Sequence, residues 1–202
     1  TLFAHLDNNV ESIESLLLSM LYKRDQWFDH LPSLLQDPDS AKRTLMAHID
    51  ELAEESLAIV RAALLPYAAT LVELNNNSAD NWPQDKGPAP TSLTALPAAN
   101  ADALSEWRNI ARLLLTAEGN WRKTINKTQG FPAKSSVPAD RQAHAVDMIA
   151  RFKALVTELE DAAGVEAPAL AQLTTLPSRE SVVQQWPLLS SLAQTLRLLH
   201  PN

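Results

Sequence analysis

The 202-residue sequence contains no cysteine and only four glycines. Without thiols it has no disulfide framework, no zinc–thiolate site and no thiolate nucleophile. No glycine precedes a Lys-Ser/Thr pair and no apolar strand ends in Asp-Glu, so the phosphate loop and magnesium-binding carboxylates of an ATP hydrolase are missing. We therefore predict that this chain is not an enzyme by itself and that it holds no cofactor.

Signals for secretion, membrane insertion and metal binding are also missing. The sequence shows no apolar run of about 20 residues, and no basic stretch with an apolar core follows its start. The five histidines are scattered, and the acidic run from Asp50 to Glu55 lacks the Glu-x-x-His element of a di-metal carboxylate bundle. These absences predict a cytoplasmic protein with no membrane contact and no metal site.

Helical periodicity extends over nearly the whole sequence. Apolar residues step by threes and fours in five long stretches, 2–20, 45–64, 104–114, 146–159 and 182–199. Pro66 predicts an interruption after the second stretch, Ser178 an N-cap for the last, and Pro187 a kink or division within it. The predicted fold class is all-α, an irregular helical bundle of about six to eight helices in which residues 1–202 form a single domain.

Two segments depart from this periodicity. Residues 75–100 begin with three asparagines and contain four prolines, which predicts one long Pro/Asn-rich loop or a partly disordered excursion. Residues 116–137 contain Gly119, Gly130 and Pro132, which predicts an irregular basic connection.

The charge of the chain is unevenly distributed. The formal net charge is −7, yet seven basic residues between Arg108 and Arg141 face only Glu118 and Asp140. Aromatic residues, Trp121 and Phe131, lie among these cations. Basic and aromatic side chains together can hold a phosphate backbone and stack on unpaired bases, so this segment is a candidate nucleic-acid surface. The alternative is a solvated charged face whose two aromatic residues anchor an irregular segment to the bundle.

Two parts of the sequence resemble a known family. Residues His5–Asn9 and Met20–Trp27 resemble the stretch downstream of the phosphate loop in bacterial UvrD/RecB-like helicases. Residues Arg112–Thr116, Gly119–Lys123 and Gln129–Pro132 resemble the "LLLT…G-x-WRK…GFP" element of the same proteins, of the exonuclease V β-subunit-like branch. With the later Gln-Trp-Pro-Leu-Leu segment the resemblance spans nearly the whole chain, except residues 75–100.

In such helicases an α-helical subdomain called 1B is inserted into the first motor domain. The resemblance implies that this chain is that insert and that it contacts DNA, at a fork or as a single strand, beside the remainder of the helicase chain. It also implies that ATP and magnesium belong to the parent protein. The candidate DNA contacts are Arg122, Lys123 and Lys127, then Arg108 and Arg112, with Trp121 among them.

The start on Thr1 without methionine and the apolar helix near the end also suggest an excised piece, and an insert predicts that Thr1 and Asn202 lie close together. Two alternatives stay open. The first is a helical protein–protein interaction module that docks a partner subunit. The second is a helical metal or cofactor enzyme, which needs polar groups that face inward.

Overall fold

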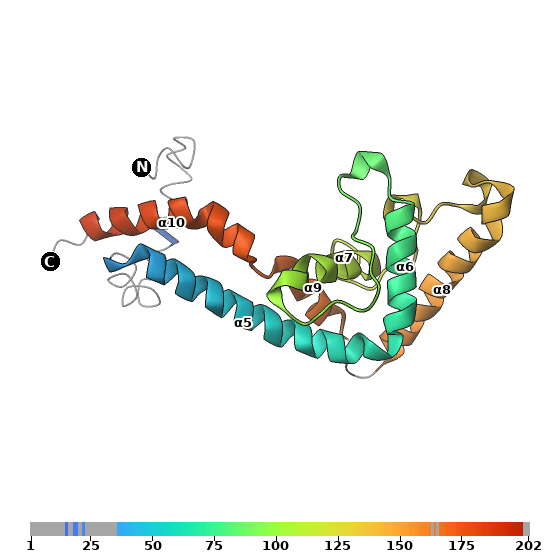
Figure 1. The fold of residues 1–202 in the computed structure, drawn as a ribbon, viewed down its shortest axis with the longest axis horizontal. Coiled ribbons are helices and arrows are strands. Elements are labelled where there is room, and N and C mark those ends of the chain that lie inside the picture. Colours follow the sequence, from blue (N-terminus) through green and yellow to red (C-terminus); the bar gives the residue numbers. More distant parts are fainter. Residues whose placement is uncertain are drawn as a thin grey trace. The chain divides into compact units, whose positions relative to one another are not determined.

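The computed structural model describes residues 36–162, 164 and 166–199, together with Ser15, Leu18, Ser19 and Tyr22. The predicted first helix and the expected proximity of Thr1 and Asn202 lie outside the described residues. Six α-helices occur in the described ranges (Figure 1): α5 (Pro38–Leu64), α6 (Ala68–Asp80), α7 (Leu104–Leu114), α8 (Gln142–Asp161), α9 (Ala167–Thr175) and α10 (Arg179–Leu199).

Short 3-10 turns join these helices, and no strand occurs among the residues described. The turns are η2 (Leu65–Tyr67), η3 (Gln84–Lys86), η4 (Ala101–Ala103), η5 (Lys127–Gln129), η6 (Lys134–Ser136) and η7 (Ala139–Arg141). One isolated antiparallel bridge pairs Leu115 with Trp121. The fold is all-α, as the periodicity predicts.

The chain divides into two compact units, Thr1–Asp50 with Pro177–Asn202, and Glu51–Leu176, although one domain was expected from the sequence. In the first unit, the Asp37 carboxylate accepts from the Ser40 amide at 2.9 Å and caps the start of α5. Ser178 caps α10, because its hydroxyl oxygen accepts from the Ser181 amide at 3.2 Å. α10 continues through Pro187 as one helix, so the predicted division there does not occur.

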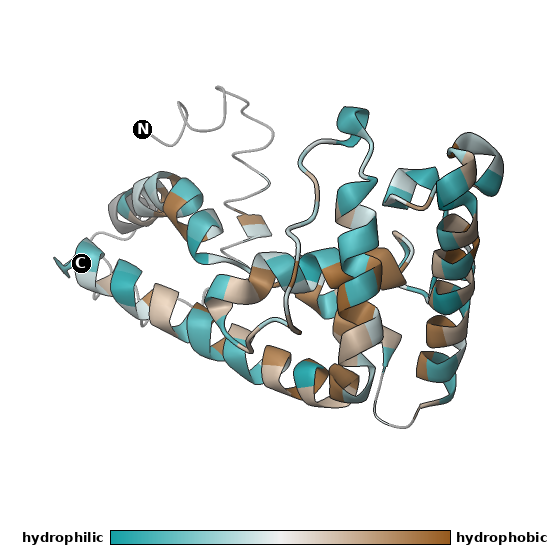
Figure 2. Ribbon diagram, turned by 45° about the vertical axis from the view of Figure 1, so that its right-hand side comes forward, coloured by the Kyte–Doolittle hydropathy of each residue, from teal (hydrophilic) through white to brown (hydrophobic). Residues whose placement is uncertain are grey.

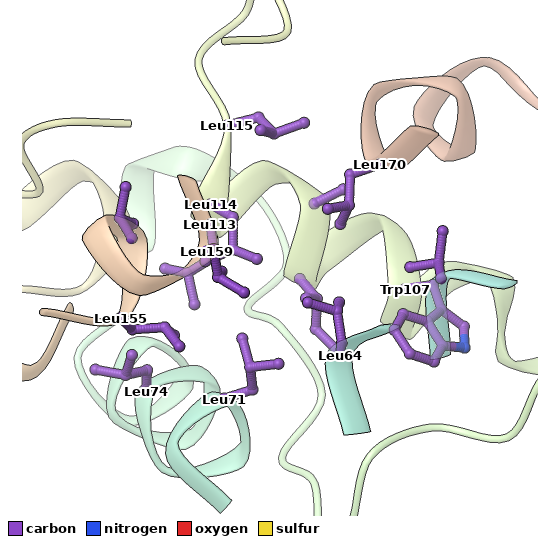
Figure 3. Packing of buried hydrophobic residues seen from close by; sticks show 14 of the residues in the cluster. Leu64, Leu71, Leu74, Trp107, Leu113, Leu114, Leu115, Leu155, Leu159 and Leu170 are labelled. Carbon is purple, nitrogen blue, oxygen red and sulfur yellow. The ribbon is translucent and has the colours of Figure 1, made fainter. Parts of the chain in front are cut away.

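The second unit holds a continuous apolar core. α7 packs against α6 and α9, and α6 packs against α8. Figure 3 shows Leu71 and Leu74 of α6 beside Leu155 and Leu159 of α8, all of them buried. Figure 2 shows hydrophobic residues recurring along α8 at helical spacing, with hydrophilic residues between them. Most of the amphipathic pattern predicted for α8 is the pattern of burial, since Met148, Phe152 and Leu159 are buried. Val146 of α8 and Leu52 of α5, which also belong to the predicted apolar stretches, are 50% and 47% exposed.

Trp107 is the largest fully buried side chain of this core. Its indole N–H donates to the Ala98 carbonyl at 2.8 Å, and Figure 3 shows its ring beside Leu64. Burial of the ring is compatible with its polar N–H only because that hydrogen bond is made.

The asparagine segment corrects the sequence prediction. Residues 75–80 form the last turns of α6 instead of the start of a loop. Asparagine is a weak helix former because its side chain competes for backbone hydrogen bonds. Here the side chains of Asn75 and Asn77 are buried and bond to distant carbonyls of Thr91 and Gly130, at 2.8 and 3.2 Å. Tertiary hydrogen bonds thus override the local preference, and the irregular segment is ordered and begins at Asn81.

One stretch meets the length and composition of a membrane span, which differs from the sequence prediction. Pro38–Asp80 contains an 18-residue window of mean hydropathy 1.6, of which 28% is buried. This stretch joins α5, η2 and α6, and it supplies Leu57, Leu64 and Leu71 to the core of the second unit. An apolar composition of this kind is also typical of helices that form a protein core, and it is compatible with a soluble protein.

Candidate nucleic-acid interface

The cation-rich stretch from Arg108 to Arg141, which we call the basic segment, contains a tight turn that folds back on the C-terminal end of α7. The Arg122 amide donates to the Leu114 carbonyl at 2.8 Å, and the Thr116 amide donates to the Asn120 carbonyl at 2.8 Å. Gly119, with φ of 80°, lies at the tip of this turn. We call residues 115–122 the α7 hairpin.

Arg122 holds the α7 hairpin against α7. Its guanidinium donates to three carbonyl oxygens, those of Arg112 at 3.1 Å, Leu113 at 3.2 Å and Leu115 at 2.5 Å. Helix C-termini leave carbonyls without partners and carry a partial negative charge, which a cation at this position satisfies. Burial lowers the pKa of Arg122 from its ordinary value, in keeping with a guanidinium held in the fold.

Two further candidate cations also bond within the protein. Arg108 on α7 donates to the carbonyls of Leu173 and Leu176 at the C-terminal end of α9, the first at 3.2 Å. Burial, and secondarily repulsion from Arg112, lowers the pKa of Arg108. Lys123 forms an ion pair with Glu160 of α8. These contacts link the basic segment to the helices around it.

The two aromatic residues of the basic segment pack on the core. Phe131 is buried, and its ring centroid lies 6.0 Å from that of Phe152 in α8. Trp121 is half-buried and packs against the same core, next to its bridge with Leu115. The anchoring alternative is therefore confirmed for Phe131, and Trp121 has at least a structural role.

Arg112 and Lys127 differ from the other candidates. Both are exposed, and neither side chain forms a hydrogen bond or an ion pair with any residue that the structure describes. Lys127 is the first residue of η5, which is closed by a capping box between Asn126 and Gln129. Their charges are therefore available to a ligand, on backbone that is well ordered.

Arg112 lines two separate hollows of the second unit. The first, of about 540 Å³, lies between the α7 hairpin and α9, and we call it the threonine groove. Its polar lining comes from hydroxyls, two arginines and one carboxylate: Thr116, Thr174, Thr175, Arg112, Arg122 and Glu118.

The second hollow, of about 310 Å³, lies under the loop that follows α6. Its lining includes Trp82, Lys86, Asn109, Arg112 and Gln129, and we call it the tryptophan groove. Trp82 and Lys86 were not among the residues chosen from the sequence. A tryptophan four residues from a lysine in a polar loop is the signal that points to them, and only the fold brings them to Arg112.

Within the described residues, no three His, Asp or Glu side chains gather as metal ligands. No protein-family model, curated protein or solved structure matches the chain.

Proposed function

We propose that this chain is a DNA-contacting accessory subdomain of a cytoplasmic superfamily 1 helicase of the UvrD/RecB type, with no catalysis of its own. The observation that carries the proposal is the pair of exposed cations without partners, Arg112 and Lys127, within the segment that resembles this family. ATP and magnesium belong to the parent protein in this proposal.

The phosphate contacts are assigned to Arg112 and Lys127 on energetic grounds. To reach a phosphate, Arg122 has to give up three carbonyl acceptors and Lys123 has to leave Glu160. Exposed cations without partners lose no protein hydrogen bond when they bind, and they release condensed counterions from the DNA. Arg122, Lys123 and Arg108 then support the surface, and Arg112 and Lys127 touch the ligand.

Arg112 is the group of the threonine groove that can hold a phosphate. The hydroxyls of Thr174 and Thr175 already donate to the Ala171 and Gln172 carbonyls, at 2.7 and 3.0 Å, and the Glu118 carboxylate repels an anion. The contact assigned to this groove is therefore that of a cation with the backbone, which positions a strand without reading its sequence. Because the whole chain has a net charge of −7, we expect such binding only around the exposed cations Arg112 and Lys127.

The proposal is tested by binding of a fluorescent forked DNA at low salt. The double variant Arg112→Ala/Lys127→Ala is expected to bind roughly 100-fold more weakly, since each of the two charged contacts contributes on the order of 1.5 kcal/mol. The matched control is Arg141→Ala/Lys153→Ala, which removes one arginine and one lysine that are also exposed. Equal losses in both variants would mean that the attraction is diffuse, and the assignment would be wrong.

A second function, docking of a partner protein, is favoured by one feature of α5. Leu52 and Ile59 are seven residues apart on this helix and are 47% and 68% exposed. A chain that retains its helicity and fails to bind forked DNA at low salt would favour this function. If the DNA proposal is right, Leu52→Glu/Ile59→Glu weakens DNA binding far less than the loss of Arg112 and Lys127 does.

A further inference from the structure

The loop after α6 carries a groove whose chemistry the basic segment does not explain. Most residues that line the tryptophan groove belong to residues 75–100, which the resemblance to helicases does not cover. Its volume of about 310 Å³ is at the lower end for sites that hold small organic groups. We propose that it binds one unpaired nucleotide of a DNA strand, with the base on Trp82 and the phosphate between Lys86 and Arg112. This inference rests on the proposed function.

Trp82 is held in place by its own loop. Its indole N–H donates to the Gly87 carbonyl at 3.2 Å, so the polar atom of the ring is satisfied within the protein. Gly87 adopts φ of 79°, which lets the chain turn back toward the ring. The side chain remains half-exposed and lines the groove. What it offers a ligand is therefore its aromatic surface, which suits stacking with any base.

The rest of the loop is fixed by side chains of α6. Asn75 donates to the Thr91 carbonyl at 2.8 Å. Asn76 donates to the Leu93 carbonyl at 2.8 Å and accepts from the Leu93 amide at 2.7 Å. A loop ordered in the free protein loses less conformational entropy when a ligand binds, which favours a preformed site. Figure 1 shows the turn η3, which contains Lys86, just beyond the C-terminal end of α6.

The charged and polar residues that line the tryptophan groove indicate which class of ligand it can bind. Lys86 and Arg112 line it, and no Asp or Glu is among its described lining residues. Asp85 is next to Lys86 in the chain but does not line the groove. Asn109 adds an amide with no hydrogen-bond partner among the described residues, which can meet the polar edge of a base. An aromatic ring, two cations and an amide together fit a nucleotide better than a neutral or a cationic ligand.

Arg112 connects this site to the proposed function because it lines both grooves. A strand with a phosphate on Arg112 can place one base under the loop while its backbone continues beyond Arg112, on the side of the threonine groove. We therefore expect the site to bind the unpaired arm of a fork and not its duplex.

The test is titration of the full chain with oligo(dT) and, in parallel, with free dTMP, followed by tryptophan fluorescence and by anisotropy of labelled DNA. Oligo(dT) is expected to quench the fluorescence of the wild type. Trp82→Phe should keep most of the affinity and lose the quenching. Trp82→Leu should lose roughly 5- to 100-fold in affinity, the range for one stacked base. Lys86→Ala should weaken binding, and Lys134→Ala, another exposed lysine outside the groove, should not.

Each result separates this inference from the proposed function. The nucleotide site alone is overturned if binding of forked DNA depends on Arg112 and Lys127 but the affinity for DNA is unchanged in Trp82→Leu and Lys86→Ala. Quenching by oligo(dT) that is lost in Trp82→Phe, in a chain that shows no preference for forks, supports the site and overturns the fork-contact role. Stronger binding of dTMP than of oligo(dT) overturns the claim that the bound nucleotide is part of a DNA strand, and it assigns the groove to a free nucleotide. No binding of either ligand overturns the inference.

Discussion

Arg122 shows how a residue that looks like a ligand contact can serve the fold. Its three carbonyl acceptors lie seven to ten residues earlier in the chain, at the end of α7. Lys123, the next residue, has a side chain that is 68% exposed and forms an ion pair with Glu160. Two adjacent cations therefore have different energetic roles, and stability measurements can separate them.

We expect Arg122→Ala to lower the free energy of unfolding by about 2–3 kcal/mol, because a charged donor to several carbonyls is lost. Lys123→Ala should lower it by less than about 1 kcal/mol, since an exposed ion pair contributes little. Urea denaturation followed by circular dichroism measures both. Equal effects would contradict the structural role given to Arg122.

Gly130 is the second residue whose identity the fold requires. It adopts φ of 77°, and a Cβ atom there would lie 2.3 Å from the Ser78 carbonyl oxygen. Its own carbonyl accepts from the buried Asn77 side chain, and the Ser78 hydroxyl donates to the adjacent Gln129 carbonyl at 2.8 Å. The close approach of two backbones is thus stabilised on both sides.

Gly130→Ala is expected to destabilise the protein well beyond the roughly 1–2 kcal/mol that a left-handed conformation alone costs. The control is Gly164→Ala, because Gly164 also has positive φ, 87°, and a Cβ there meets no atom within 4 Å. Thermal unfolding of the two variants measures the difference. Equal losses of stability in Gly130→Ala and Gly164→Ala would mean that the close packing of Gly130 against Ser78 contributes nothing to the free energy of unfolding.

At the scale of elements, side chains from the C-terminal half of α6 hold two irregular segments in place, and we call this set of hydrogen bonds the clamp. Asn75 and Asn76 bind the loop at Thr91 and Leu93, and Asn77 binds Gly130. Buried polar groups cost free energy unless they are hydrogen-bonded, and the buried amides of Asn75 and Asn77 are paired with backbone carbonyls of the irregular segments. The clamp explains how a loop rich in proline, with few backbone hydrogen bonds of its own, is ordered.

Asn76→Ala should release this loop without unfolding the helices. The variant loses two hydrogen bonds to Leu93, worth on the order of 1–3 kcal/mol together. Hydrogen exchange and limited proteolysis should then increase within residues 88–100 and stay unchanged in α8. Gln172→Ala, which truncates an exposed amide on α9, is the control. Unchanged exchange at Leu93 in Asn76→Ala would contradict the clamp.

The same elements show what sequence could and could not predict. The periodicity of α7 and α8, the interruption at Pro66 and the cap at Ser178 depend on residues a few positions apart, so they could be read from local pattern. The helical state of Asn75–Asn77 depends on acceptors 16 to 53 residues away. The polar composition alone therefore predicted a loop where the chain forms a helix.

The candidate site was predictable only in part for the same reason. The density of cations indicated the segment, and the two residues that the proposal assigns to phosphate contact, Arg112 and Lys127, are among its cations. It could not separate them from Arg108 and Arg122, whose acceptors are backbone carbonyls of α9 and α7. Trp82 and Lys86 were missed because they lie in a different segment, and the fold alone brings them to one groove with Arg112.

At the scale of the whole molecule, an acidic chain contains one stretch, residues 108–141, in which seven basic residues face two acidic ones. In the proposed function this stretch attracts DNA, although the net charge of −7 works against DNA binding elsewhere. In the proposed function the surface guides a strand beside a motor domain, and the free chain makes few phosphate contacts. A few contacts leave a characteristic salt dependence, because each one releases a fixed number of counterions.

The most direct test is the salt dependence of forked-DNA binding in the wild type and in Arg112→Ala/Lys127→Ala. If these side chains neutralise two phosphates, the slope of log affinity against log salt becomes shallower by about 2 in the variant. Arg141→Ala/Lys153→Ala should keep the wild-type slope. A slope that is the same in all three proteins, or a wild type that shows no binding at low salt, would contradict a DNA-contact surface at Arg112 and Lys127.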